Sequence, residues 1–535
     1  MRRHPKKAMG GEMTHRNPDG AVRLVLQGMA CAAVLSIAGC GGGGGGGGAA
    51  SSSGATPSTE PPPSAASSAA QCVAPRTGLN PSTGLAYADR AGTVADEKNW
   101  VRSWIDQTYL WYDEVPTNLQ AASYATPVAY FDVLKTPVLT ASGRAKDRFH
   151  FSYPTATYGD VQQGTEVGYG VEFAFLQRTA PRTIRVAYTE PDSPASRAGI
   201  VRGDTLLAID GIDASKASSQ ADVDQLNSAL APATSGQSHA FKLRAKDGTE
   251  RTVTLVSAGI ERSPVQNVRT IDTPGGRVGY LQFNDHVAKS EAQLVAAMGQ
   301  LSAAGVTNLV LDMRYNGGGL LGIASEVASM IATPQASQGA VFEKLQFNRK
   351  NPFNVSATGS SVIFPTTTRG YSVTAGQPLP RLGLSRVSVL AGPDTCSASE
   401  SVVNGLRGIG VTVDLIGAAT CGKPYGFYPQ DNCGTTYFAI QFQGVNAKGF
   451  GDYGDGMAPN CTVADDFEHA LGDPAEGRFA AALSYRASGV CPVPAQASAA
   501  RRSAVAAPLP EASGTPYLDR NMLRSNRIIE SADLQ

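Results

Sequence analysis

Residues 309–331 read LVLDMRYNGGGLLGIASEVASMI, and this stretch carries the pattern that decides the fold. Residues 309–313 are almost continuously apolar, as expected of a strand that is buried on both faces of a sheet. Three glycines follow, and residues 320–331 have a helical pattern. A strand, a tight turn and a helix in this order are typical of α/β architecture.

The same alternation extends over residues 275–490. Apolar segments predict further strands at 278–283, 387–391 and 411–416. Leu294, Val295, Met298 and Leu301 are spaced to line one face of a helix, and another helix is expected from about Ala398. We therefore expect an α/β core in which helices cross over between strands.

Composition limits the class of protein. A chain of 535 residues allows three or four domains, and 42% hydrophobic with 17% charged residues is typical of globular protein. Lysine plus arginine and aspartate plus glutamate both number 45, so the formal charge is zero. A balanced charge argues against a nucleic-acid partner and against a polybasic membrane-surface protein.

Residues 1–40 read as an export signal. Basic residues precede an apolar stretch at 24–38, which is too short to span a bilayer. It ends in Ile37-Ala38-Gly39-Cys40, which resembles a bacterial lipoprotein signal whose cysteine is lipidated. This predicts a lipid anchor at Cys40 and a place in the bacterial cell envelope, facing the periplasm or the cell exterior. A plain secretory signal is the alternative.

Two segments have the composition of disordered chain. Residues 41–87 begin with eight glycines and continue in Ser, Ala, Pro and Thr, so they predict a flexible tether. Residues 494–535 are rich in Ala, Ser, Pro and Arg and predict a disordered tail. Residues 88–157 instead have helical spacing of large apolar side chains, including Trp100 and Trp104, and predict a small helical domain.

Residues 158–260 predict short strands with one helix at about 221–230, and Asp247-Gly248 marks a hairpin. The run SPASRAGIVRGDTLLAIDG at 193–211 closely resembles a PDZ domain. In that family a loop before the first core strand presents N–H groups to the carboxylate of a bound peptide. The matching residues here are Gly168, Tyr169, Gly170 and Val171. A PDZ fold that acts only as a spacer is the alternative.

Two strand-to-helix turns carry candidate chemistry. The glycines at 317–319 let a ligand approach the backbone, and the helix that follows offers free N–H groups, as an oxyanion hole requires. The second turn contains Ser397-Ala398-Ser399-Glu400. It matches a helix capping box, but a serine at a helix start is also a suitable nucleophile, with the N–H of Ala398 sharing the oxyanion.

A serine nucleophile needs a base. None of the six histidines adjoins the serine motif, although a Ser/His/Asp triad stays open. Lys423, in Thr420-Cys421-Gly422-Lys423, is the other candidate. Such a lysine must be neutral, and burial lowers the pKa of a lysine toward the working range.

Together these motifs resemble the C-terminal processing peptidases over roughly residues 90–490. The resemblance implies a crotonase-like protease core at 261–493 with an inserted PDZ domain. It assigns Ser397 as the nucleophile, Lys423 as the general base, and Gly318 with Ala398 to the oxyanion hole. It also implies endopeptidase action on polypeptides without a metal or organic cofactor.

Two positions depart from the family pattern. Pro424 directly follows Lys423, which is atypical of the family. Phe427 stands where the family often has a glutamine that orients the lysine amine. A catalytically inactive, lipid-anchored scaffold that binds peptides through the PDZ-like domain is therefore the alternative function.

The cysteines indicate the cellular compartment of the protein, and two of them lie next to the candidate catalytic residues. Besides Cys31 and Cys40 the chain has Cys72, Cys396, Cys421, Cys433, Cys461 and Cys491, an even number that predicts disulfides in an exported protein. Because Cys396 adjoins Ser397 and Cys421 lies two residues before Lys423, we hypothesise a bridge between these two loops. A thiol nucleophile at Cys396 is the alternative.

One acidic run has side chains of the types that ligate metal ions. Residues 465–469 read DDFEH, and these side chains could hold a cation. We expect a solvated acidic face instead, so no metal site is predicted.

Overall fold

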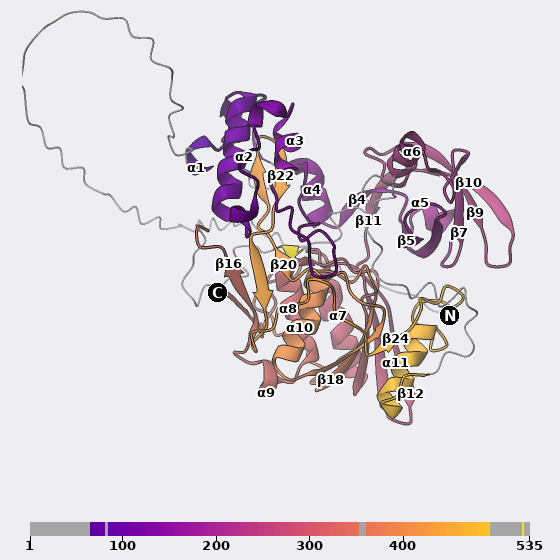
Figure 1. Ribbon diagram of the computed structural model, residues 1–535. Helices are drawn as coiled ribbons and strands as arrows, with labels where there is room; N and C mark the ends of the chain where they lie inside the picture. The colour runs from indigo at the N-terminus through magenta and orange to yellow at the C-terminus, as the bar shows by residue number, and fades with distance from the viewer. Residues whose placement is uncertain (1–64, 81–83, 352–359, 493–526, 529–535) are drawn as a thin grey trace, which may run out of the picture. The chain divides into compact units, whose positions relative to one another are not determined.

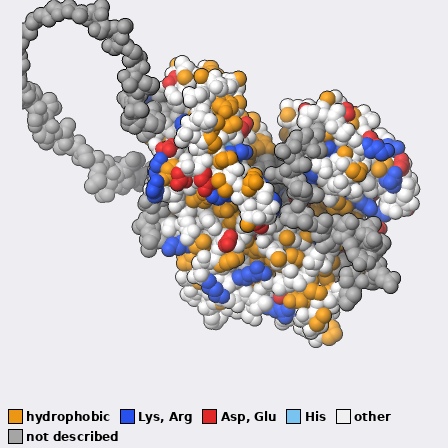
Figure 2. Space-filling model, in the orientation of Figure 1, with side chains coloured by type: hydrophobic (Ala, Val, Ile, Leu, Met, Phe, Trp, Pro, Cys, Tyr) orange, Lys and Arg blue, Asp and Glu red, His pale blue; other side chains and the backbone are white. Residues whose placement is uncertain are grey.

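The computed structural model describes residues 65–80, 84–351, 360–492 and 527–528 (Figure 1). The predicted signal peptide with Cys40, most of the tether and most of the tail lie outside these ranges and stay predictions. The disordered tether predicted for residues 41–87 is wrong at its end, because residues 65–68 form a helix and residues 71–72 form a strand that a disulfide at Cys72 fixes. Among the described residues, no helix has both the length and the apolar character needed to cross a bilayer. Basic and acidic side chains are interspersed on the face drawn in Figure 2.

A six-stranded sheet in the order β12-β13-β14-β18-β19-β24 forms the core. Its strands are β12 (Val265–Thr273), β13 (Gly276–Phe283), β14 (Asn308–Asp312), β18 (Arg386–Ala391), β19 (Thr412–Gly417) and β24 (Cys461–Thr462). All pairs from β13 to β24 are parallel, and only β12 is antiparallel to its neighbour. The predicted α/β architecture is confirmed.

Helices cover both faces of this sheet. On one face, α7 (Ser290–Ala303), α8 (Leu321–Ile331) and α10 (Ala398–Gly408) share a hydrophobic cluster with Leu309 and Leu311. Val310, which points the other way, packs with Phe479 of α11 (Gly477–Ser488), and Figure 1 shows α11 apart from α8 and α10. Because both faces are covered, every residue of β14 is buried, which explains the apolar Leu309, Val310 and Leu311 at its centre.

The helical periodicity predicted near Trp100 is confirmed. Helix α2 (Val94–Thr108) starts at a capping box between Thr93 and Asp96, and it buries Trp100 and Trp104, whose rings stack 5.6 Å apart. Shorter helices complete this region, namely α1 (Ala65–Ser68), η1 (Tyr112–Glu114), η2 (Ala121–Ser123), α3 (Pro127–Phe131) and α4 (Thr155–Gln162). Strand β3 (Phe151–Pro154) pairs with β22 (Thr435–Phe438), so this region joins a sheet with distant chain.

A β-rich domain, defined here as residues 165–261, has its own sheet in the order β10-β9-β7-β6-β5. It contains β5 (Val171–Gln177), β6 (Thr183–Thr189), α5 (Pro194–Arg197), β7 (Thr205–Ile209), β8 (Ile212–Asp213), α6 (Gln220–Leu230), β9 (Ser238–Arg244) and β10 (Glu250–Val256). The chain enters and leaves this domain through β4 (Thr165–Gly168) and β11 (Ala258–Glu261), which pair with each other. The predicted strands and helix are confirmed.

Smaller sheets surround the core sheet. One has the order β17-β16-β23-β20, another the order β21-β22-β3, and three are pairs, namely β1-β2, β15-β25 and the β11-β4 pair already described. Their strands are β1 (Gln71–Cys72), β2 (Arg90–Ala91), β15 (Gly319–Leu320), β16 (Val341–Phe347), β17 (Ser361–Ile363), β20 (Tyr425–Gly426), β21 (Gln430–Asn432), β23 (Phe442–Val445) and β25 (Arg527–Ile528). A short helix α9 (Pro334–Ser337) precedes β16.

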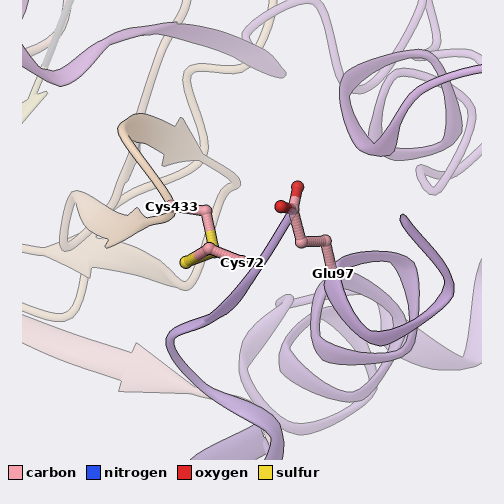
Figure 3. A group of neighbouring side chains, drawn as sticks. All are labelled: Cys72, Glu97 and Cys433. Atoms are coloured by element: carbon pink, nitrogen blue, oxygen red, sulfur yellow. A yellow bond between two sulfur atoms is a disulfide. The ribbon is translucent and has the colours of Figure 1, made fainter. Parts of the chain in front are cut away.

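Six cysteines form three disulfides. Cys72–Cys433 ties β1 to the turn after β21, and Figure 3 shows Glu97 of α2 beside it. Cys461–Cys491 ties β24 to the chain after α11. The hypothesised Cys396–Cys421 bridge is confirmed, and the thiol nucleophile at Cys396 is wrong because that sulfur is in the bridge.

Candidate active site

Three loops follow the carboxyl ends of neighbouring parallel strands. The chain passes from β14 into the glycines at 317–319, from β18 to Ser397 and from β19 to Lys423. The carboxyl ends of parallel strands lie on one edge of a sheet, where open α/β proteins bind ligands. The sheet order therefore gathers the three predicted motifs.

Hydrogen bonds join the glycine loop to the serine loop. The backbone oxygen of Asn316 accepts from the N–H of Cys396 at 3.0 Å and from the hydroxyl of Ser399 at 2.9 Å. The hydroxyl of Thr395 donates to the backbone oxygen of Met313 at 2.9 Å. The serine loop is thus attached to the glycine loop through residues that come before Ser397 in the chain and through one that comes after it.

Ser397 has a backbone conformation that is uncommon for a residue with a side chain. Its φ is 58° and its ψ is −113°, and the residue is fully buried. Such strained conformations cluster at active sites. Ala398 is the first residue of α10, so its N–H has no acceptor within the helix. This N–H lies at the positive end of the helix dipole, which favours a negatively charged acceptor.

The carboxylate of Glu400 connects the serine loop to the lysine loop. Its Oε2 accepts the backbone N–H of Ser397 and that of Lys423, each at 2.9 Å. Its Oε1 accepts the N–H of Gly422 at 2.9 Å and the hydroxyl of Thr420 at 2.5 Å. Burial raises the pKa of Glu400, although these donors oppose the rise.

Sequence reasoning treated Glu400 only as one half of a capping box and missed its contact with the lysine loop. The local pattern contains the serine-side contact alone, because the lysine loop lies more than twenty residues further along the chain. A second link joins the same loops, since Cys421 is bonded to Cys396 and its N–H donates to the backbone oxygen of Thr395 at 3.0 Å.

Lys423 is fully buried. Its Nζ lies 4.2 Å from the ring centroid of Phe427 and 4.6 Å from that of Phe149. One of the two residues that depart from the family pattern therefore faces the lysine directly, and two aromatic rings flank the amine.

Both backbone groups of Gly318, a residue expected to border the oxyanion hole, have partners within the protein. Its N–H donates to Oδ1 of Asn316 at 3.0 Å, and its carbonyl accepts the N–H of His286 at 3.1 Å. Both backbone groups are engaged in this conformation, so the N–H is not directed at a substrate carbonyl. The sequence could not show this, because the acceptor is a side chain whose orientation depends on the fold.

His286, which does not adjoin the serine motif in the sequence, contacts the glycine loop in the structure. Its Nδ1 lies 3.0 Å from Oδ1 of Asn316, which already accepts the N–H of Gly318, so Nδ1 carries the proton. Burial lowers the pKa of His286 to about 3, so the ring is neutral. A Cβ on Gly319 would lie 2.3 Å from the carbonyl oxygen of His286, which explains the glycine there.

Asp312 and Arg314 of the glycine motif belong to a buried ion network. The guanidinium of Arg314 donates hydrogen bonds to Asp312 and to both carboxylate oxygens of Glu476. It also forms an ion pair with Asp465 at 2.8 Å. The expectation of a solvated acidic face is therefore wrong for Asp465. Burial alone would raise the pKa of Asp465, but Arg314 and other nearby arginines lower it below its usual range.

The network continues into the β-rich domain. Arg202 of that domain donates to Asp465 at 2.7 Å and to the hydroxyl of Tyr315 at 2.7 Å. Tyr315 immediately precedes Asn316, whose side chain holds the N–H of Gly318. The β-rich domain therefore contacts the loop that carries the candidate oxyanion site.

The predicted peptide-binding residues lie in a separate pocket. Gly168, Tyr169, Gly170 and Val171 connect β4 to β5 and line this pocket together with Leu230 and other side chains of the β-rich domain. The Tyr169 ring is buried against Phe241, and a Cβ on Gly170 would lie 2.2 Å from the Cβ of Ser193. None of the three candidate catalytic loops lines this pocket.

Cys396, Glu400 and Cys421 lie close enough together to suit a metal ion, as do Cys72, Glu97 and Cys433 (Figure 3). Both pairs of cysteines are joined in disulfides, so their sulfurs are not thiolate ligands.

Two sequence families match the chain. Peptidase family S41 matches residues 277–428, which include all three loops, and the peptidase S41 N-terminal domain matches residues 96–153. A structure described as an S41 protease from Bacteroides fragilis is 22% identical with a TM-score of 0.55, and the alignment covers 73% of this chain and 97% of that one. That likeness shows a shared fold.

The chain is also similar to curated proteins named carboxyl-terminal-processing proteases. A carboxyl-terminal-processing protease of Picosynechococcus is 30% identical over 236 residues, covering 44% of this chain and 49% of the relative. A carboxyl-terminal-processing protease of Synechocystis is 28% identical, covering 32% of this chain and 40% of the relative. The chain thus spans half or less of the length of these relatives. The chain is therefore similar to carboxyl-terminal-processing proteases, and two of its regions match the models of the S41 peptidase and of the S41 N-terminal domain.

Proposed function

We propose that the chain is a serine endopeptidase in which Ser397 attacks the substrate and Lys423 is the general base. The observation that carries the proposal is the shared carboxylate of Glu400, which accepts the N–H groups of both residues through one oxygen. The strained backbone of Ser397, its position before α10 and the Cys396–Cys421 bridge support the same assignment.

In the proposed reaction, the neutral amine of Lys423 takes the hydroxyl proton of Ser397 as the serine oxygen attacks a peptide carbonyl. The N–H of Ala398 donates to the oxyanion that forms. Lys423 then returns the proton to the departing amine, and water hydrolyses the acyl-enzyme. No metal or organic cofactor takes part in these steps.

A second oxyanion donor is expected from the glycine loop. Gly318 can supply its N–H only after the bond to Asn316 opens. Gly319 is the next residue along the same loop and has a φ of 135°, which suits glycine. We therefore assign the second donor to the backbone at 318–319.

We also propose that the core is crotonase-like and that the β-rich domain is a PDZ-like peptide-binding domain. Strand β5 is at the edge of its sheet and follows directly from the loop at 168–170. An edge strand with such a loop suits an extended peptide that adds to the sheet. The expected partner is a polypeptide substrate.

For location, we propose a lipid-anchored protein of the bacterial cell envelope, held through Cys40. The three disulfides support an oxidising compartment. A Cys40→Ser variant should leave the membrane fraction. Unchanged membrane association would contradict the anchor.

The second candidate function is an inactive peptide-binding scaffold. It is favoured by Phe427 at the position of the expected glutamine and by the engaged N–H of Gly318. The two functions predict different results when cleavage of an unstructured polypeptide is measured. A protease cleaves it as the wild-type full chain but not as the Ser397→Ala or Lys423→Ala variant, whereas a scaffold does not cleave it in any form.

Exposed residues of the same types provide matched controls, namely Ser484→Ala and Lys448→Ala. We expect the controls to match the wild type and the two site variants to lose at least a thousandfold in turnover, about the size of a lost nucleophile or base. Equal turnover in all five proteins would overturn the dyad, and peptide binding without turnover would support the scaffold.

A further inference from the structure

The short strand β25 lies beside the glycine loop. Arg527 and Ile528 pair in parallel with Gly319 and Leu320 of β15. On β15, Gly319 also forms a bridge with His286. The strand that directly follows Gly318 is therefore paired with a segment more than two hundred residues away in sequence.

The same segment also approaches the lysine loop. β25 contacts β20, which begins two residues after Lys423. Residues 527–528 thus run between the strand that follows the candidate oxyanion loop and the strand that follows the candidate base.

An extended peptide can bind a protease by adding to a strand edge that lies next to the reacting groups. β15 has such an edge, and in this structure β25 takes it. Because a strand ladder is built from backbone N–H and C=O groups, the same edge can accept extended segments of other sequences.

We propose that the edge of β15 is the docking edge for extended substrates and that the segment at 527–528 is its intramolecular occupant. The segment then competes with substrate for one edge. This inference rests on the proposed protease function for its kinetic consequence but not for the contact itself.

The test uses the full chain with the double substitution Arg527→Pro and Ile528→Pro, since proline removes the N–H that a ladder needs. Ala504→Pro is the matched control, because it adds proline to the same segment outside β25. Two quantities are measured: the kinetics on a fluorogenic peptide, and hydrogen–deuterium exchange of a fragment that contains Gly319 and Leu320.

We expect the double variant to show a KM several-fold below that of the wild type, the same kcat, and faster exchange at 319–320. The control should match the wild type in all three. A synthetic peptide of residues 521–535, added to the double variant, should act as a competitive inhibitor and slow the exchange again.

Unchanged exchange in the double variant would overturn the contact, and an unchanged KM would overturn the competition. If no variant cleaves any peptide but exchange rises in the double variant alone, the docking edge is supported while the proposed protease function fails. The two failures are therefore distinguishable.

Discussion

The carboxylate of Glu400 accepts the backbone N–H of Lys423 at 2.9 Å, and the same oxygen accepts the N–H of Ser397 at 2.9 Å. One buried oxygen thus fixes how far apart the two backbones lie. Glu400 is a positioning residue in the proposed protease, because its bonds are to the backbones of the dyad. The alignment of nucleophile and base depends on a third residue that reacts with neither.

The first prediction concerns Glu400→Gln. The substitution keeps the shape but replaces one acceptor oxygen with an NH2 group that faces N–H donors. Each buried donor left unsatisfied costs about 1–3 kcal/mol, so we expect a clear fall in the melting temperature. Because the dyad loses its alignment, kcat should fall at least tenfold while KM changes little. Steady-state kinetics and thermal melts measure both effects.

Glu326→Gln is the matched control. Glu326 is a buried glutamate of α8 whose carboxylate accepts the N–H of Arg369. The same isosteric change there should leave kcat within about twofold. A similar kcat loss in both variants would contradict a specific role for Glu400.

The second prediction concerns the Cys396–Cys421 bridge. Its cysteines are 25 residues apart, and a loop of that size is stabilised by about 3–4 kcal/mol in the chain-entropy account. A Cys396→Ala, Cys421→Ala double variant should lose stability by up to that amount. It should also lose kcat, because the bridge adjoins both members of the dyad.

Cys461 and Cys491 form a bridge of similar span, 30 residues apart, that joins β24 to the chain after α11. Their double alanine variant should lose comparable stability in chemical denaturation but retain kcat. If both double variants lose kcat equally, the site bridge acts only through global stability.

The third prediction concerns the backbone of Ser397, whose φ of 58° favours glycine. Ser397→Gly and Ser397→Ala both remove the nucleophile and should both be inactive. The glycine variant should be more stable than the alanine variant by about 1 kcal/mol, because a φ of 58° strains alanine but not glycine. Urea denaturation midpoints compare the two. A more stable alanine variant would show that the site is not strained.

The fourth prediction is a pH dependence at His286. Burial lowers the pKa of His286 from 6.5 to about 3, so the unfolded chain takes up a proton below about pH 6.5 while the folded chain does not. Stability from this group is therefore full above pH 6.5 and is lost as the pH falls toward 3. The loss is about 1.4 kcal/mol per pH unit within that window.

His286→Gln removes this titration. We expect the variant to be less stable than the wild type near pH 7, because its contact with Asn316 is altered. The difference in unfolding free energy should shrink by about 2 kcal/mol between about pH 7 and pH 5. A constant difference across that range would show that His286 is accessible to protons in the folded protein.

Local pattern was sufficient for many elements of this protein. The apolar run at 309–313 predicted β14, and the spacing of Leu294, Met298 and Leu301 predicted α7. It failed where partners are distant. The pairing of β3 with β22 joins segments about 280 residues apart, and no periodicity within either strand indicates the other.

The amino-acid sequence by itself determined the order of strands and helices and the three candidate motifs, because periodicity and turn residues are signals among near neighbours. The even number of cysteines is a property of composition and needs no structure to be seen. Only the tertiary structure decided that Glu400 bridges the two dyad loops, that Asn316 engages the N–H of Gly318 and that Phe427 faces Lys423. Those facts depend on which strands lie side by side and on where buried side chains find partners, and both are set by packing across the whole chain.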